Sequence, residues 1–173
     1  METTQAREVD IVQLVIGNKN YSSWSMRLWV LLAHYSLPFE EIRVPLFIAG
    51  YQQELQKYSL ALKVPVLIDD ELSIWDSLAI CEYVSEQYLE GKAWPASRQK
   101  RALTRSYCAE MHSGFMAIRN DLPMNCRARR RIQLDSSMPE ECQRIDTLWA
   151  DARQRHGSQG DYLFGDFSIA DCM

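Results

Sequence analysis

Hydrophobic and polar positions alternate between two periods in the first half of the chain. A short β-branched apolar run at residues 11–16 ends at Gly17 and predicts a buried strand. Apolar residues at helical spacing then predict a helix over 25–36, which Pro38 stops. The later patterns predict a strand at 40–44, a weak helix at 47–58, a hairpin of strands at 66–68 and 72–75, and a helix at 77–88. This β-α-β-α-β-β-α order predicts an α/β domain over residues 9–89, with helices packed on a small mixed sheet.

The second half of the chain has a different pattern. Residues 90–96 break the periodicity and predict a linker, after which helical spacing runs over 97–121 and again from Pro139 to Gly157. No strand pattern follows, so residues 97–173 are predicted to form an all-α domain. The Ser168–Asp171 pair has the spacing of a capping box that starts another helix, yet the chain ends at Met173. We therefore expect this domain to be incomplete, with on the order of 40 further residues in the natural protein.

Composition narrows the class of protein. Of 173 residues, 47% are hydrophobic and 24% charged, which is typical of a folded globular chain. The net charge of −4 predicts no general attraction to nucleic acid or to membranes, and no apolar run is long enough to span a bilayer. Five cysteines without C-x-x-C spacing argue against a disulfide framework or a metal site. Without a signal peptide, a cytoplasmic location is expected.

The loop between the first predicted strand and helix carries three serines, Ser22, Ser23 and Ser25. Ligands of open α/β sheets bind at the carboxyl ends of strands, near helix N-termini. Hydroxyl donors there, beside the positive end of a helix dipole, can stabilise a thiolate, an alkoxide or a carboxylate. The simpler interpretation is that one serine caps the helix.

Two further loops are expected at the same edge of the sheet. Asp76 and Ser77 begin the third helix, where they either form a plain cap or hold the ammonium and carboxylate groups of an amino acid. Pro65 opens a strand. If its peptide bond were cis, the backbone before it would be turned outward and could pair with an extended ligand, although trans is the default for such bonds.

These segments resemble the glutathione transferase superfamily. The resemblance is carried by YSSWSMR at 21–27, KVPVL at 63–67, WDSLAICEY at 75–83 and FSIAD at 167–171. It implies a thioredoxin-like N-terminal domain, an all-helical C-terminal domain and a cis bond between Val64 and Pro65. It further implies glutathione as co-substrate, a role in detoxification and a homodimer.

The resemblance also implies roles for nine residues. Ser22, and after it Ser23, would donate a hydrogen bond to the glutathione thiolate. The tripeptide would be bound by Lys63, Val64, Pro65, Asp76 and Ser77. Trp24 and His112 would line the pocket of a small hydrophobic electrophile, although His112 also suits a surface or interface position.

The implied activity is glutathione transfer to that electrophile. The serine motif is most similar to that of the zeta class, S-S-C-S-W-R, but Trp24 stands in place of its cysteine. The alternatives are a glutathione-dependent isomerase, a peroxidase or disulfide reductase, or a non-catalytic glutathione-binding protein.

Overall fold

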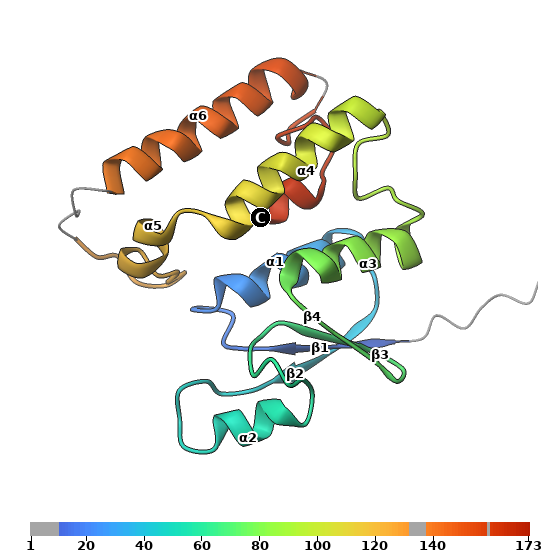
Figure 1. Ribbon diagram of the computed structural model, residues 1–173, viewed down its shortest axis with the longest axis vertical. Coiled ribbons are helices and arrows are strands. Elements are labelled where there is room, and N and C mark those ends of the chain that lie inside the picture. Colours follow the sequence, from blue (N-terminus) through green and yellow to red (C-terminus); the bar gives the residue numbers. More distant parts are fainter. Residues whose placement is uncertain (1–10, 132–137, 159) are drawn as a thin grey trace, which may run out of the picture.

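The computed structural model of the chain describes residues 11–131, 138–158 and 160–173. Its first half contains a four-stranded sheet in the order β2-β1-β3-β4 (Figure 1). The strands are β1 (Val12–Ile16), β2 (Phe39–Arg43), β3 (Val66–Asp69) and β4 (Leu72–Trp75). The first two strands pair in parallel and the other neighbours pair antiparallel, so the predicted mixed sheet is confirmed. Residues 9–10 of the predicted domain lie outside the described residues.

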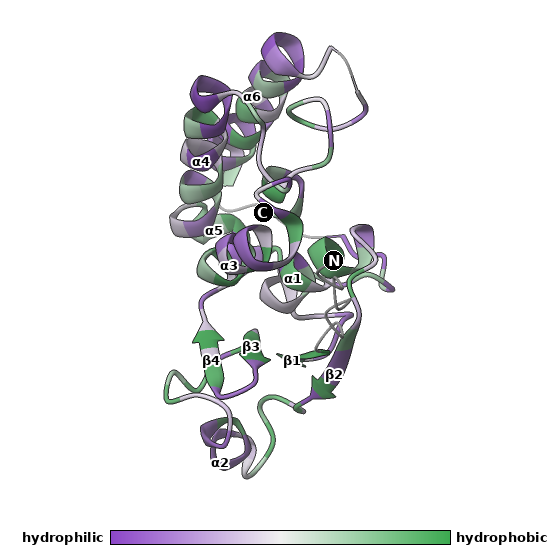
Figure 2. Cartoon of the chain, turned by 90° about the vertical axis from the view of Figure 1, so that its right-hand side faces the viewer, coloured by the Kyte–Doolittle hydropathy of each residue, from purple (hydrophilic) through white to green (hydrophobic). Residues whose placement is uncertain are grey.

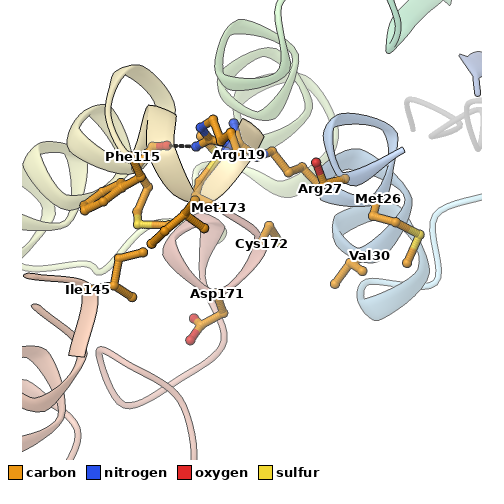
Figure 3. Close-up of a pocket in the computed structure, with 12 residues that line it drawn as sticks. Met26, Arg27, Val30, Phe115, Arg119, Ile145, Asp171, Cys172 and Met173 are labelled. Carbon is orange, nitrogen blue, oxygen red and sulfur yellow. Dashed lines mark hydrogen bonds between the residues drawn. The ribbon is translucent and has the colours of Figure 1, made fainter. Parts of the chain in front are cut away.

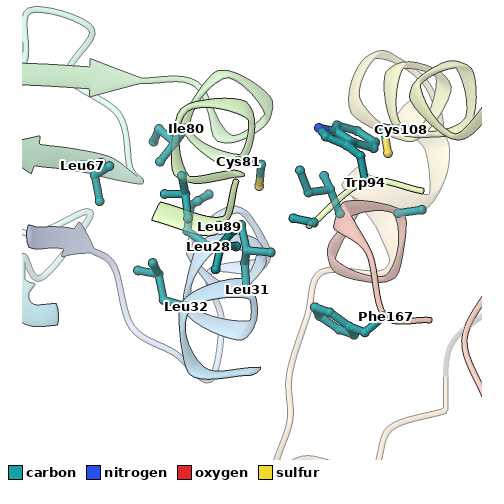
Figure 4. Close-up of a cluster of buried hydrophobic side chains, with 14 of the residues drawn as sticks. Leu28, Leu31, Leu32, Leu67, Ile80, Cys81, Leu89, Trp94, Cys108 and Phe167 are labelled. Carbon is teal, nitrogen blue, oxygen red and sulfur yellow. The ribbon is translucent and has the colours of Figure 1, made fainter. Parts of the chain in front are cut away.

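Helices cover both faces of this sheet. Helices α1 (Ser23–His34) and α3 (Ser77–Leu89) lie between the sheet and the helical half, and α2 (Tyr51–Gln56) lies on the opposite face (Figures 1 and 2). The larger core joins one face of the sheet, α1 and α3 to the C-terminal segment, and Figure 4 shows part of it. A smaller core under α2 consists of Val15, Val44, Leu55 and Val66.

Two of these helices start at positions that differ from the prediction. Helix α1 begins at Ser23 rather than at residue 25, because Ser22 already serves as its N-cap. Helix α2 begins at Tyr51 rather than at residue 47. Phe47 has a φ of 63° and Gly50 a φ of 84°, so both are outside the right-handed helical region.

The second half is helical, with α4 (Arg98–Ser113), α5 (Met116–Asp121), α6 (Met138–His156) and the short 3₁₀ helix η1 (Ile169–Cys172). The prediction of one helix over 97–121 is wrong, because Gly114 is extended and Phe115 has a φ of 64°. Phe115 is nevertheless buried, so the apolar period continues across the break and hides it. No helix in the described ranges is long and apolar enough to cross a membrane.

Contacts from the linker and the C-terminal segment join the two halves. Within the linker, Trp94 is buried and its indole N–H donates to Glu82 at 2.8 Å. The predicted capping box is confirmed, since the backbone N–H of Ser168 donates to the Asp171 carboxylate at 2.8 Å. The short helix η1 itself packs against α1 and α4.

Candidate functional site

A cavity of about 1000 Å³ opens where the loop before α1, the segment before β3 and the start of α3 meet α4. All nine residues singled out from the sequence line it, namely Ser22, Ser23, Trp24, Lys63, Val64, Pro65, Asp76, Ser77 and His112. The structure therefore brings together residues that lie as far as 90 positions apart in the chain. The chemical role of each residue stays a prediction.

The serine loop is held by a short chain of hydrogen bonds. Ser22 caps α1, with its Oγ 3.4 Å from the Ser25 backbone N and 2.8 Å from Ser25 Oγ. Ser25 is fully buried, and its Oγ accepts from the backbone N–H of Gly17 at 3.1 Å. When the Ser25 hydroxyl donates to Ser22, both contacts of Ser22 Oγ are acceptor contacts and its own O–H is free. Capping and donation to a ligand are therefore compatible at Ser22.

Ser23 differs from its neighbour. It is the first residue of α1, it is exposed, and within the described ranges its side chain has no hydrogen-bond partner. It lines the large cavity and also a smaller one described below.

The segment before β3 forms another wall of the cavity. The peptide bond between Val64 and Pro65 is cis, as the family resemblance implied, so the trans default is wrong. Pro65 is buried, Val64 is partly buried, and Lys63 is exposed at the rim.

At the start of α3, the two predicted residues have different surroundings. Asp76 is the N-cap, and its Oδ1 accepts from the backbone N–H groups of Leu78 at 2.9 Å and Ala79 at 3.1 Å. Its Oδ2 lies 3.0 Å from Nε2 of His112. Ser77 is buried, and its Oγ accepts from Arg27 Nη1 at 3.1 Å.

Arg27 is a site residue that the sequence analysis missed. It comes from α1 and is only 4% exposed, with Nη1 also 3.2 Å from Nδ1 of His112. Its guanidinium lies 4.1 Å from the centroid of the Trp24 ring. Burial lowers the pKa of Arg27 to about 10. The partners of Arg27 come from the start of α3 and from α4, so no local pattern in the sequence marks this arginine.

Arg119 of α5 was also missed. Its guanidinium lies 4.8 Å from the Trp24 ring, and it donates to the carbonyl groups of Gly114 and Met111. Burial also lowers the pKa of Arg119. It faces a smaller cavity of about 250 Å³, whose wall includes Arg27, Phe115 and Met173 (Figure 3). Among the described residues, no cluster of His, Cys, Asp and Glu side chains is arranged to hold a metal ion.

Comparison with known proteins agrees with this geometry. Residues 21–87 match the family model described as the N-terminal domain of glutathione S-transferase. The chain is 30% identical over 156 residues to maleylacetoacetate isomerase of Rattus norvegicus, covering 87% of this chain and 69% of that protein. It is 33% identical over 102 residues to the enzyme of the same name from Mus musculus, covering 57% of this chain and 47% of that protein.

Solved structures show the same fold. A glutathione transferase homologue from Burkholderia with bound glutathione superposes with a TM-score of 0.67 and 28% identity, covering 94% of this chain and 76% of that chain. An epsilon-class glutathione S-transferase from Musca domestica superposes with a TM-score of 0.72 and 24% identity, covering 93% of this chain and 73% of that chain. On these matches and the thioredoxin-like and helical halves just described, the chain belongs to the glutathione S-transferase superfamily.

Proposed function

We propose that the chain is a glutathione transferase that adds the glutathione thiolate to a small hydrophobic electrophile. One observation carries the proposal: Ser22 at the start of α1 and the Asp76–Ser77 pair at the start of α3 line the same cavity. One helix start suits an anionic sulfur, and the other suits the amino-acid end of the tripeptide.

The sulfur chemistry follows from the Ser22 hydroxyl, which can donate to a ligand when the Ser25 hydroxyl donates to the Ser22 oxygen. A free thiol has a pKa of about 8.5, and only its thiolate is a good nucleophile. A serine cannot remove the proton at neutral pH, but a hydrogen bond donated to the anion lowers the pKa of the thiol. Ser22 is the proposed donor, and the dipole of α1 adds to its effect. Ser23 is the second candidate because its hydroxyl has no hydrogen-bond partner among the residues that the structure describes.

The other proposed contacts with glutathione come from residues that line the cavity. The carboxylate of Asp76 would accept from the α-ammonium group of glutathione, and Ser77 would donate to the neighbouring α-carboxylate. The backbone of Val64 would pair with the cysteinyl part, with Pro65 packed behind it. Lys63, exposed at the rim, would add positive charge for an anionic tripeptide. Trp24 and His112 would form the wall toward the electrophile.

Glutathione-dependent isomerisation is the second candidate. It is favoured by the relatives named maleylacetoacetate isomerase. Trp24 speaks against isomerisation and for transfer, because it stands where the zeta-class motif has cysteine. Peroxide or disulfide reduction by bound glutathione and binding without catalysis are the remaining alternatives.

The purified chain should be assayed for conjugation of glutathione to a chlorodinitrobenzene, for isomerisation of maleylacetoacetate and for hydroperoxide reduction. Calorimetry should measure glutathione binding in parallel. We expect binding and conjugation. Isomerisation without conjugation would favour the second candidate, and binding without any turnover would favour a binding protein. Absence of binding would overturn the proposal. Sedimentation of the same sample tests the homodimer that the family resemblance implies.

A further inference from the structure

We infer that His112 is a positioning residue, placed between Arg27 and Asp76, that prepares the α3 N-terminus for the amino-acid end of glutathione. The inference rests on the proposed function, which places His112 in the wall toward the electrophile, and adds to it a second role for this side chain. His112 lies on α4, whereas the residues it connects lie on α1 and at the start of α3.

The imidazole bridges the two ionic groups directly. Its Nε2 is 3.0 Å from Asp76 Oδ2, and its Nδ1 is 3.2 Å from Arg27 Nη1. The ring of Trp24 meets it edge-on, with centroids 5.4 Å apart. Three contacts on three sides therefore fix the orientation of the ring.

The partners also determine where its proton lies. A guanidinium can only donate hydrogen bonds, so Nδ1 must accept from Arg27 and carry no proton. The proton of the neutral ring is then on Nε2, pointing at the Asp76 carboxylate. A second proton on Nδ1 would face the guanidinium of Arg27. Neither nitrogen has a free lone pair, so His112 is not the base that deprotonates a thiol.

At the start of α3, these contacts leave the cavity with one hydrogen-bond acceptor, the Asp76 carboxylate, beside one hydrogen-bond donor, the Ser77 hydroxyl. One oxygen of Asp76 is held by the first N–H groups of α3 and the other by His112, and the remaining lone pairs of this carboxylate can only accept. Arg27 donates to Ser77 Oγ, which leaves the Ser77 hydroxyl proton to donate. An acceptor beside a donor complements the ammonium and carboxylate groups of an α-amino acid.

Replacement of His112 tests this role. His112→Phe keeps an aromatic ring beside Trp24 but removes both hydrogen bonds. We expect glutathione binding to weaken at least about tenfold, the cost of one hydrogen bond to a charged group, with KM for glutathione affected far more than kcat. His112→Gln keeps one N–H donor and one acceptor and should restore part of the affinity. Ser113→Ala, on the same helix, is the matched control because, among the described residues, its hydroxyl donates to the backbone carbonyl of Ala109 in α4 and contacts no side chain by hydrogen bonding.

A second measurement reads the state of the imidazole in the wild-type protein itself. Long-range ¹H–¹⁵N spectra of the wild-type imidazoles distinguish the two neutral tautomers and the imidazolium. The protein has three histidines, so the His112→Gln spectrum identifies the signal. We expect the Nε2–H tautomer at neutral pH. An Nδ1–H tautomer or an imidazolium would overturn the inference.

The binding data separate this inference from the proposed function. If wild-type protein binds glutathione and well-folded His112→Phe binds it equally well, the positioning role is wrong while the proposed function stands. A loss confined to kcat would also overturn the positioning role, because it would leave glutathione binding unaffected. If wild-type protein binds no glutathione, the proposed function fails, whatever the tautomer.

Discussion

The hydroxyl oxygens of Ser22 and Ser25 lie 2.8 Å apart, so the proposed thiolate donor is tied to a side chain that is fully buried. The buried member is itself fixed by the backbone N–H of Gly17 at the end of β1. The position of the Ser22 hydroxyl is therefore set by the strand and the helix together. A donor held in this way needs little reorganisation when an anion forms beside it.

The first prediction concerns Ser22→Ala. The variant should bind glutathione almost as tightly as wild type, but the pKa of the bound thiol should rise because the anion loses a hydrogen-bond donor. A hydrogen bond to a charged group contributes about 1.5–3 kcal/mol, so kcat/KM should fall about 10- to 100-fold at neutral pH. The ultraviolet absorbance of the thiolate, followed against pH, gives the thiol pKa directly.

Ser23→Ala is the matched control for this prediction. If Ser22→Ala leaves turnover unchanged and Ser23→Ala lowers it, the donor is Ser23. Ser25→Ala serves a different purpose, since it leaves the buried N–H of Gly17 without its partner. Its free energy of unfolding should fall by about 1–3 kcal/mol.

The second prediction separates the structural role of Asp76 from its proposed binding role. Asn caps a helix about as well as Asp, so Asp76→Asn should keep the stability of α3, whereas Asp76→Ala should lose about 1 kcal/mol. Both variants lose the negative charge that faces the cavity, and both should weaken glutathione binding by more than tenfold. Thermal unfolding and calorimetry on the two variants measure these effects separately. If Asp76→Asn binds glutathione like wild type, the carboxylate does not hold the ammonium group.

Much of the N-terminal half could be predicted from the sequence because its signals are local. The β-branched run before Gly17 is buried almost throughout as β1, and turn residues bound the β3–β4 hairpin. The cap of α3 was visible in Asp76. The clustering of the site followed from the rule that such loops meet at one edge of an α/β sheet.

Other features depend on contacts between distant residues and left no local signal. The break at Gly114 and Phe115 is hidden because Phe115 remains buried on the face that a continuous helix would use. Arg27 was missed because its partners, Ser77 and His112, lie 50 and 85 positions away. The cis bond before Pro65 was implied only by the family resemblance.

The third prediction concerns the five cysteines, which differ in accessibility. Cys126 and Cys142 are exposed. Burial raises the pKa of Cys108 to about 12 and also raises the pKa values of Cys81 and Cys172. A chromogenic disulfide reagent at neutral pH should therefore titrate two thiols rapidly in the native protein and all five after unfolding, because the thiolate is the reactive form.

Single Ser replacements check that assignment. Cys126→Ser and Cys142→Ser should each remove one rapidly reacting thiol, whereas Cys108→Ser should leave the rapid phase unchanged. A third rapid thiol in the native wild-type protein would contradict either the burial of Cys81 and Cys108 or the raised pKa of the partly buried Cys172.

The last prediction concerns the pH dependence of stability at the contact between α4 and α6. The Tyr107 hydroxyl donates to the Asp151 carboxylate at 2.5 Å. Burial, followed by this hydrogen bond, raises the pKa of Tyr107 from its ordinary value of 10.0 to about 12. Because the pKa of Tyr107 is higher in the folded state, the protonated phenol stabilises the fold fully below pH 10.0. This stabilisation disappears as the pH rises through about 12. Removing the Tyr107 hydroxyl should lower the free energy of unfolding by about 1 kcal/mol near neutral pH.

Tyr107→Phe tests this sign, because the variant has no phenol to ionise. Urea unfolding of both proteins should show wild type more stable at neutral pH, with the difference shrinking steadily between about pH 10 and 12. Tyr21→Phe is the control, since Tyr21 is 60% exposed and its removal should leave the profile unchanged. A Tyr107→Phe difference that stays constant up to about pH 12 would mean that the phenol is not held by Asp151 in solution.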